Sequence, residues 1–186
     1  MKKILKNALL LILIISIFGI LYFLSKWNKI NVDENIGKSS GIKNLNSKVL
    51  DHTFLIFDTS NVKTDFKVLE NESDTVTFNF NAAQSPKSKN LYFLTFNSGD
   101  GFSGVNINIF KYRNFYYTKA ESYTDVKKTF DFLEPARYIV EKQKLTLNKS
   151  EYKIGDSIFG KIELQIKFKA LDTLINSNGY FRGIIE

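Results

Sequence analysis

Cysteine is absent from this sequence of 186 residues. The chain therefore has no disulfide, no thiolate ligand for a metal and no cysteine nucleophile. Histidine occurs once, as His52, whereas a zinc site needs three or four nitrogen, sulfur or oxygen ligands. We accordingly assign no catalytic residue and no metal-binding or cofactor-binding residue, and we expect no cofactor.

Arginine is nearly as scarce, with only Arg113, Arg137 and Arg182 among 26 basic residues. Arginine is the side chain best suited to binding phosphate through two parallel hydrogen bonds. The net charge of +7 is also unevenly placed, because five lysines flank one apolar segment and the 19 acidic residues nearly balance the other bases. This distribution argues against nucleic acid as a partner.

That apolar segment, residues 8–24, lies within 19 uncharged residues between Lys6 and Lys26. As a helix these 19 residues span roughly 28 Å, close to the ~30 Å hydrocarbon core of a bilayer. We expect a single-pass transmembrane anchor, with Tyr22 and Trp27 at the interface. The excess of lysine before the segment predicts a cytoplasmic N-terminus and a C-terminal domain outside the cytoplasm.

The alternative is a cleaved signal peptide and a secreted domain. Cleavage requires small residues at positions −3 and −1 after a shorter apolar run. Ile17 and Phe23 occupy the −3 positions of the two candidate exits, Gly19 and Ser25, so the sequence favours the uncleaved anchor.

Three regions follow from this interpretation: a cytoplasmic tip and anchor at 1–27, a flexible linker at 28–51 and an exported domain at 52–186. The linker carries glycine, serine and asparagine without a sustained apolar period. The exported region instead contains short runs rich in Phe, Val, Ile and Tyr, separated by turn residues, which predict antiparallel strands. The runs are 53–58, 66–69, 75–81, 91–97, 105–110, 112–118, 137–147, 158–168 and 180–185.

The predicted fold is therefore mainly β: an N-terminal transmembrane helix followed by one antiparallel β-sandwich or barrel-like domain. Residues 122–133 fit either a short helix or a strand, because periodicity alone does not separate the two. In the longest run, Ile162 and Leu164 are expected to be buried and Lys161 and Glu163 exposed. Gly160 is interpreted as a bulge. The Asn178-Gly179 pair is interpreted as a hairpin turn before the last strand.

One short pattern carries a resemblance. Residues 145–162 hold a Tyr152-x-x-Gly155-Asp156 corner between two apolar runs. The segment resembles the strand–turn–strand opening of immunoglobulin-like and macroglobulin-type β-sandwich modules. The resemblance covers about a tenth of the chain, and its place at the end of the domain departs from the usual one. It implies a sandwich fold and a module that binds or spaces, and it implies no chemistry.

The candidate partner-binding residues are aromatic: Tyr112, Phe115, Tyr116 and Tyr117. On a single strand, Tyr112 and Tyr116 would share one face, and Phe115 and Tyr117 the other. An open face would offer a stacking platform, whereas a central strand would bury these rings as packing.

Three functions remain open at this point. The first is a membrane-anchored envelope domain that binds or spaces a protein, glycan or lipid partner without catalysis. The second is a lipid or glycolipid carrier, because the layout resembles single-span lipopolysaccharide-transport components; an open apolar groove between the sheets would favour it. The third is a hydrolase built on unrecognised carboxylates, for which the candidates are Asp100, Asp125, Asp131 and Asp156.

Overall fold

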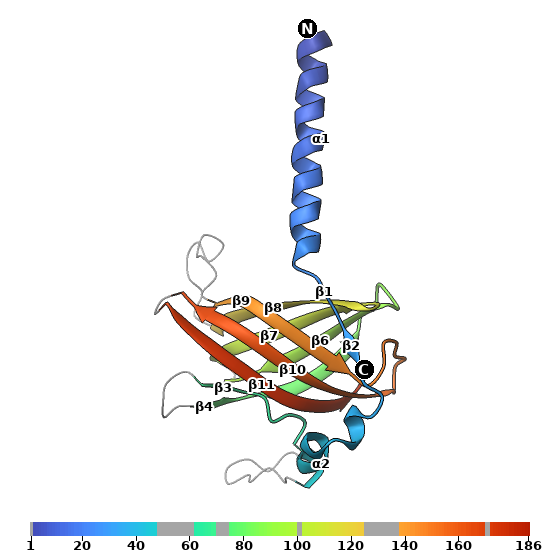
Figure 1. Cartoon of the computed structure of the whole chain (residues 1–186), viewed down its shortest axis with the longest axis vertical. Helices are drawn as coiled ribbons and strands as arrows, with labels where there is room; N and C mark the ends of the chain where they lie inside the picture. Colours follow the sequence, from blue (N-terminus) through green and yellow to red (C-terminus); the bar gives the residue numbers. More distant parts are fainter. Residues whose placement is uncertain (1, 48–61, 70–74, 100–101, 125–137, 170–171) are drawn as a thin grey trace.

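The computed structural model describes residues 2–47, 62–69, 75–99, 102–124, 138–169 and 172–186 (Figure 1). A single long helix, α1 (Lys2–Ser25), stands apart from a β domain that contains every described strand. Within the described residues, no helix has both the length and the hydropathy that crossing a membrane requires. The described fold is mainly β, as the sequence predicts.

The first sheet is an antiparallel meander in which each strand pairs with the next along the chain. Its strands are β5 (Asn79–Gln84), β6 (Leu91–Asn97), β7 (Ser103–Tyr112) and β8 (Phe115–Thr124), with the short β1 (Asn28–Lys29) added to the outer edge of β8. Inward side chains alternate with outward ones, so Ile107 and Ile109 are buried. β6 lies between β5 and β7. Its inward residues Tyr92, Leu94 and Phe96 are buried, and its outward residues are half-buried.

The second sheet continues the meander with β9 (Tyr138–Leu147), β10 (Ser157–Phe168) and β11 (Thr173–Ile184). The short β2 (Asn31–Val32) adds to β9 in parallel. The predicted faces of β10 are confirmed, because Ile162 and Leu164 are buried whereas Lys161 and Glu163 are not. The irregularity in this sheet lies between Gln165 and Ile166.

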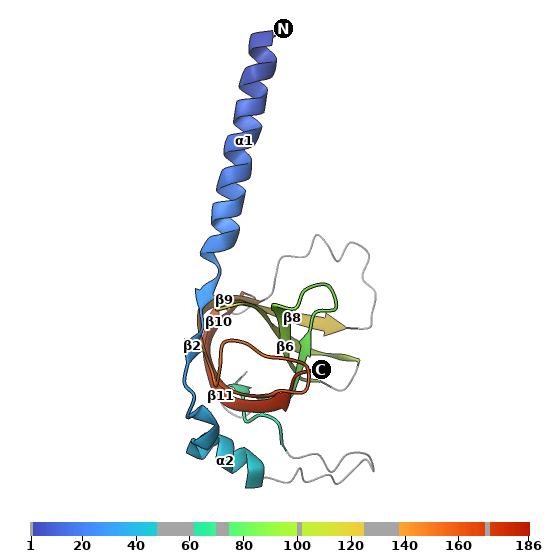
Figure 2. The same ribbon diagram turned by 90° about the vertical axis from the view of Figure 1, so that its right-hand side faces the viewer.

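The two sheets curve around one core and form a ring when viewed from the side (Figure 2). At one edge β5 meets β11 through a parallel bridge between Ala82 and Ile185. At the other edge β8 lies beside β9, but no strand ladder joins them among the described residues. A hairpin of β3 (Lys67–Leu69) and β4 (Thr75–Thr77) adds Phe66 to a cluster of packed rings: Phe66, Phe78, Phe80, Phe96 and Phe181.

The segment expected to be a flexible linker packs on the domain in its described part, 28–47. Besides β1 and β2 it forms the 3-10 turn η1 (Ile36–Lys38) and the helix α2 (Ser40–Ser47), which lies against β11. Four apolar side chains anchor it by burial: Ile30, Ile36, Ile42 and Leu45. These residues are too widely spaced to form an apolar period, which is why the sequence resembled a tether.

Two glycine interpretations were wrong. Asn178 and Gly179 lie inside the continuous strand β11, and the β10–β11 connection comes earlier, before Thr173. A Cβ on Gly179 would lie 2.3 Å from the Cα of Phe66, so this glycine permits a close backbone approach. Gly160 is no bulge either, because it pairs in register with Leu147 and Phe181. A Cβ there would meet the Phe181 ring at 2.2 Å.

Two other expectations fall largely outside the described residues. The predicted strand at 53–58 does so entirely. Of the ambiguous segment 122–133, only residues 122–124 are described, and these form the end of β8.

Candidate functional site

The four predicted binding residues do not lie on one strand. Tyr112 ends β7 and Phe115 begins β8, and the two face each other across a turn formed by Arg113 and Asn114. Arg113 adopts the left-handed region (φ 50°), which a tight turn between adjacent strands requires. Tyr112 and Phe115 are both exposed, at 40% and 50%.

The other two residues are held by packing. Tyr116 points inward and is 1% exposed, so it cannot contact a partner. Burial raises the pKa of its hydroxyl, which also forms a hydrogen bond with the backbone of Leu145 on β9. Tyr117 is half-buried on the outer face, stacked on Phe110 at 6.1 Å and close to Trp27 at 6.3 Å.

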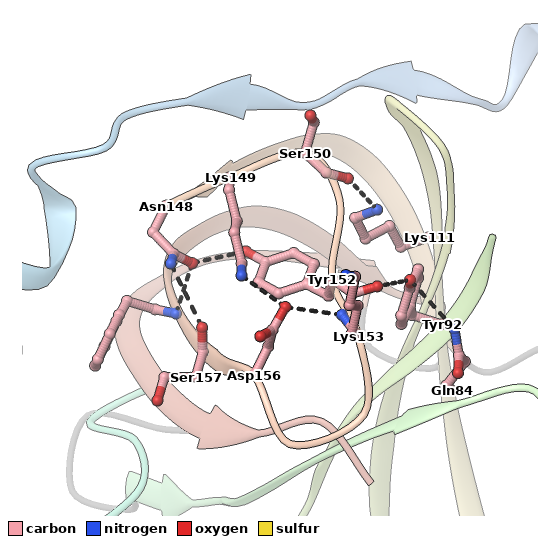
Figure 3. A network of polar contacts seen from close by, with 11 residues as sticks. Gln84, Tyr92, Lys111, Asn148, Lys149, Ser150, Tyr152, Lys153, Asp156 and Ser157 are labelled. Carbon is pink, nitrogen blue, oxygen red and sulfur yellow. Dashed lines mark hydrogen bonds and ion pairs between the residues drawn. The ribbon is translucent and has the colours of Figure 1, made fainter. Parts of the chain in front are cut away.

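Directly below the β7–β8 turn lies a buried lysine, Lys111, which is 1% exposed (Figure 3). Its Nζ donates hydrogen bonds to the carbonyl oxygens of Arg113, at 2.9 Å, and Ser150, at 2.7 Å. The same atom lies 4.7 Å from the ring centre of Tyr92 and 5.6 Å from that of Tyr152, within the range of cation–π attraction. Lys111 thus joins the β7–β8 turn to the β9–β10 loop.

No carboxylate among the described residues forms an ion pair with this ammonium group. Burial lowers the pKa of Lys111 to about 8, and the charge of Glu151 opposes that shift only in part. An amine with this pKa is partly neutral near physiological pH, which is a property of lysines that form imines. Here, however, the two carbonyls and two aromatic rings enclose it, so a structural role fits the geometry better than nucleophilic chemistry.

Two tyrosines extend this network. The Tyr92 hydroxyl donates to the carbonyl of Tyr152 at 2.5 Å and accepts from Gln84 Nε2 at 3.3 Å. Gln84 Nε2 also donates to the carbonyl of Lys89, at 2.7 Å. Side chains from β5 and β6 therefore brace the β9–β10 loop from below.

The β9–β10 loop is itself internally bonded, and it contains the Tyr-x-x-Gly-Asp corner. The Tyr152 hydroxyl donates to Asn148 Oδ1, at 2.7 Å, and Gly155 takes a positive φ of 88°. Asp156 Oδ2 accepts from Lys149 Nζ at 2.6 Å and from the backbone N–H of Lys153 at 2.8 Å, and these bonds lower the pKa of its carboxyl (Figure 3). Asp156 is therefore used as a loop brace.

Above the network lies a surface cavity of about 500 Å³, which we call the Lys111 pocket. Its rim carries three cations, Lys89, Arg113 and Lys153, and one carboxylate, Glu151. Ile154, on the same rim, is 69% exposed. This pocket was not predicted from the sequence, although one signal was present: Lys111 continues the inward alternation of Ile107 and Ile109.

Most of the other residues considered for catalysis or metal binding lie outside the described part of the chain. His52, Asp100, Asp125 and Asp131 lie outside the described residues, so only Asp156 of the four carboxylates is placed. Across the described ranges, no group of three His, Cys, Asp or Glu side chains is arranged to hold a metal ion.

Comparisons with known proteins add no relative: no family model matches the sequence, and no curated protein or solved structure does. The functional argument consequently rests on the geometry and the sequence of this chain.

Proposed function

We propose that this chain is a single-pass membrane protein whose β domain binds a partner on the outer side of the membrane without catalysis. The observation that carries the proposal is the surface of α1. Its large apolar side chains from Leu9 to Leu24 are 41–68% exposed, and the helix stands apart from the β domain (Figure 1). Such a surface is unfavourable in water and requires an apolar environment.

A bilayer fits this helix better than a protein partner would. Apolar side chains surround it on all faces, whereas a helix that docks on a protein has one apolar stripe. Counted over the whole sequence, 19 residues separate Lys6 from Lys26. Transfer of the Leu, Ile and Phe side chains of 8–24 favours the membrane by roughly 4–8 kcal/mol.

The exposed residues around the β7–β8 turn support a partner-binding surface at that place. Tyr112, Phe115 and Ile154 are exposed there, beside the Lys111 pocket and its cationic rim. Exposed aromatic and arginine side chains around a concave surface are typical of binding sites. The partner classes are a protein, a glycan or a lipid headgroup.

The carrier alternative receives less support. A cavity between the sheets, lined by residues such as Phe78, Ile107 and Ile166, has a volume of about 10 Å³. A cavity of that size holds about one water molecule, whereas a lipid carrier needs a groove long enough for an acyl chain.

The proposed membrane anchor is tested by finding out whether the N-terminal segment is retained and on which side of the membrane the β domain lies. The protein extracted from membranes should retain residues 1–30 in its intact mass and should resist alkaline carbonate extraction. Protease added to spheroplasts should digest the β domain. A mature N-terminus near residues 20–28, or release by carbonate, would overturn the anchor.

The binding surface is tested by mutation. Tyr112→Ala combined with Phe115→Ala should weaken the recovery of crosslinked partners from intact cells while leaving the melting temperature within a few degrees of wild type. The matched control is Phe102→Ala, which removes an exposed ring from a different end of β7. Equal recovery by both variants would contradict this location, and a hydrolytic activity abolished by replacing one carboxylate would contradict the absence of catalysis.

A further inference from the structure

A second cavity, of about 660 Å³, lies at the foot of α1 between β8 and β9, and we call it the β8–β9 groove. The last turn of α1 lines it with Tyr22, Ser25 and Lys26, and the rest of its wall comes from residues 117–120 and 138–143. If α1 lies in a bilayer, as proposed above, this groove opens at the level of the lipid headgroups.

The backbone along the groove is unusual for a sheet. β1 pairs with β8 only at Phe115 and Tyr116, and β2 pairs with β9 only at Thr146 and Leu147. No described strand pairs with the remaining edge of β8 or of β9 on this side. Strand edges of this kind present N–H groups that require a hydrogen-bond acceptor.

The polar side chains of the groove point to the same need. Thr118 is 2% exposed and lines the groove, yet its Oγ1 has no hydrogen-bond partner in the described part of the chain. Gln143 lines it too, and its Nε2 donates to the carbonyl of Lys26 at 3.0 Å. Its Oε1 has no described partner, but as an acceptor it adds nothing to the need for an acceptor.

The charge of the groove selects the class of ligand. Three lysines line it, Lys26, Lys119 and Lys142, against one lining glutamate, Glu141. Lys119 also pairs with Glu121 on the outer face of β8, so a ligand would share this lysine. A compact anion that accepts several hydrogen bonds, such as a phosphate diester, matches these donors.

We infer that the β8–β9 groove binds the headgroup of an anionic phospholipid from the membrane that holds α1. This inference rests on the proposed anchor and adds a ligand to it. Lys26, Lys119 and Lys142 supply the charge, and the Thr118 hydroxyl donates a hydrogen bond to the phosphate. The lipid glycerol and acyl chains remain in the bilayer beside α1.

The test uses the full chain in a neutral detergent, with lipid retention measured by native mass spectrometry. Phosphatidylglycerol should be retained at one equivalent, at a concentration at least fivefold lower than phosphatidylcholine requires. Lys119→Gln combined with Lys142→Gln should remove most of this preference. Thr118→Val, which keeps the side-chain shape, should reduce retention without unfolding the domain.

The matched control is Lys43→Gln combined with Lys67→Gln, which removes the same charge from α2 and β3 and should leave the preference unchanged. An equal loss in the control, or equal retention of both lipids, would overturn the inference. Glycerol 3-phosphate binding as tightly as the lipid, or a co-purified polypeptide protecting the groove instead, would also overturn it.

The proposed membrane anchor and the proposed lipid site in the groove can be contradicted independently of each other. A chain released by alkaline carbonate contradicts the anchor, whatever lipid it retains. A chain that stays in the membrane without any preference for phosphatidylglycerol contradicts only the groove.

Discussion

At the scale of single residues, Lys111 is a buried cation that forms no ion pair with a described carboxylate. Its pKa is about 8 in the folded chain and about 10.5 when solvated. Between these values the unfolded chain binds more protons than the folded chain, so stability rises with pH over this range. The cost of burying the charged amine is full below pH 8 and is lost above pH 10.5.

The first prediction follows from this linkage. The free energy of unfolding of the wild type, measured by urea denaturation and compared with Lys111→Met, should rise by about 2 kcal/mol between pH 8 and pH 10. Titrations shared by both proteins, including those of Tyr116 and Tyr152, cancel in the difference. Lys43→Met, at an exposed position, serves as the control. A constant difference across this range would mean that the Lys111 amine is solvated.

The second prediction separates the aromatic residues that look alike in the sequence. Tyr116→Ala should cost about 3–5 kcal/mol of unfolding free energy, because it deletes a fully buried ring. Tyr112→Ala should cost less than about 1 kcal/mol, because that ring is exposed. Similar losses in chemical denaturation would contradict the inward direction assigned to Tyr116.

At the scale of secondary-structure elements, the long hairpin of β10 and β11 is the best-defined unit. Twelve consecutive residue pairs join the two strands, from Ser157–Ile184 to Phe168–Thr173. The Asn178-Gly179 pair lies within this ladder, where a turn would break it. The third prediction tests this placement directly.

Asn178→Thr should leave stability unchanged or raise it slightly, because Asn178 is exposed and threonine favours strands. In a two-residue hairpin turn the same change would be strongly unfavourable. Gly179→Ala should cost at least about 1–3 kcal/mol, because the added Cβ would lie 2.3 Å from the backbone of Phe66. Thermal unfolding of both variants distinguishes the alternatives: a destabilised Asn178→Thr would support the turn.

The elements differ in how well the sequence predicts them, and the reason is physical. The strand at 91–97 and the alternating strand from residue 158 were predicted well, because burial on one or both faces leaves a periodic pattern. The packing of 28–47 was not predicted, because it depends on four separated side chains and on contacts distant in sequence. The Asn-Gly pair was misread because a close approach to Phe66 and a tight turn both require glycine.

The candidate sites were harder still to predict. The four predicted binding residues flank the β7–β8 turn instead of lying on one strand, and only Tyr112 and Phe115 among them are exposed. The Lys111 pocket combines strands of the first sheet with the β9–β10 loop, and the β8–β9 groove combines strands from both sheets with the end of α1. Their residues are up to 121 positions apart, from Tyr22 to Gln143, so spacing along the chain carried no signal for either site.

At the scale of the whole molecule, the join between α1 and the β domain decides how the domain is presented. Only Lys26 and Trp27 separate α1 from β1. Trp27 packs between Phe23 on the helix and Tyr117 on β8, and the Ile30 N–H donates to the carbonyl of Asn114 at 2.9 Å. The direction of the helix is therefore fixed relative to the sheets.

The fourth prediction uses Trp27, the only tryptophan of the chain, as a reporter of depth. In vesicles with brominated lipids, its fluorescence should be quenched more by bromine near the glycerol backbone than by bromine near the end of the acyl chain. Trp27→Phe removes the signal and provides the blank. Strongest quenching by the deep probes, or none at all, would contradict the proposed position of the join.

A join of two residues also limits where the domain can travel. A domain on a long tether explores a hemisphere above the membrane, and its reach grows with the square root of the tether length. If α1 spans the membrane as proposed, this domain would instead move with its helix, and its search would be confined to a thin layer parallel to the bilayer. A partner that lies farther from the membrane could contact the domain only by approaching the membrane to within the width of the domain. Partners diffusing in the same membrane would instead meet it repeatedly in a single orientation, which removes most of the rotational search from each encounter.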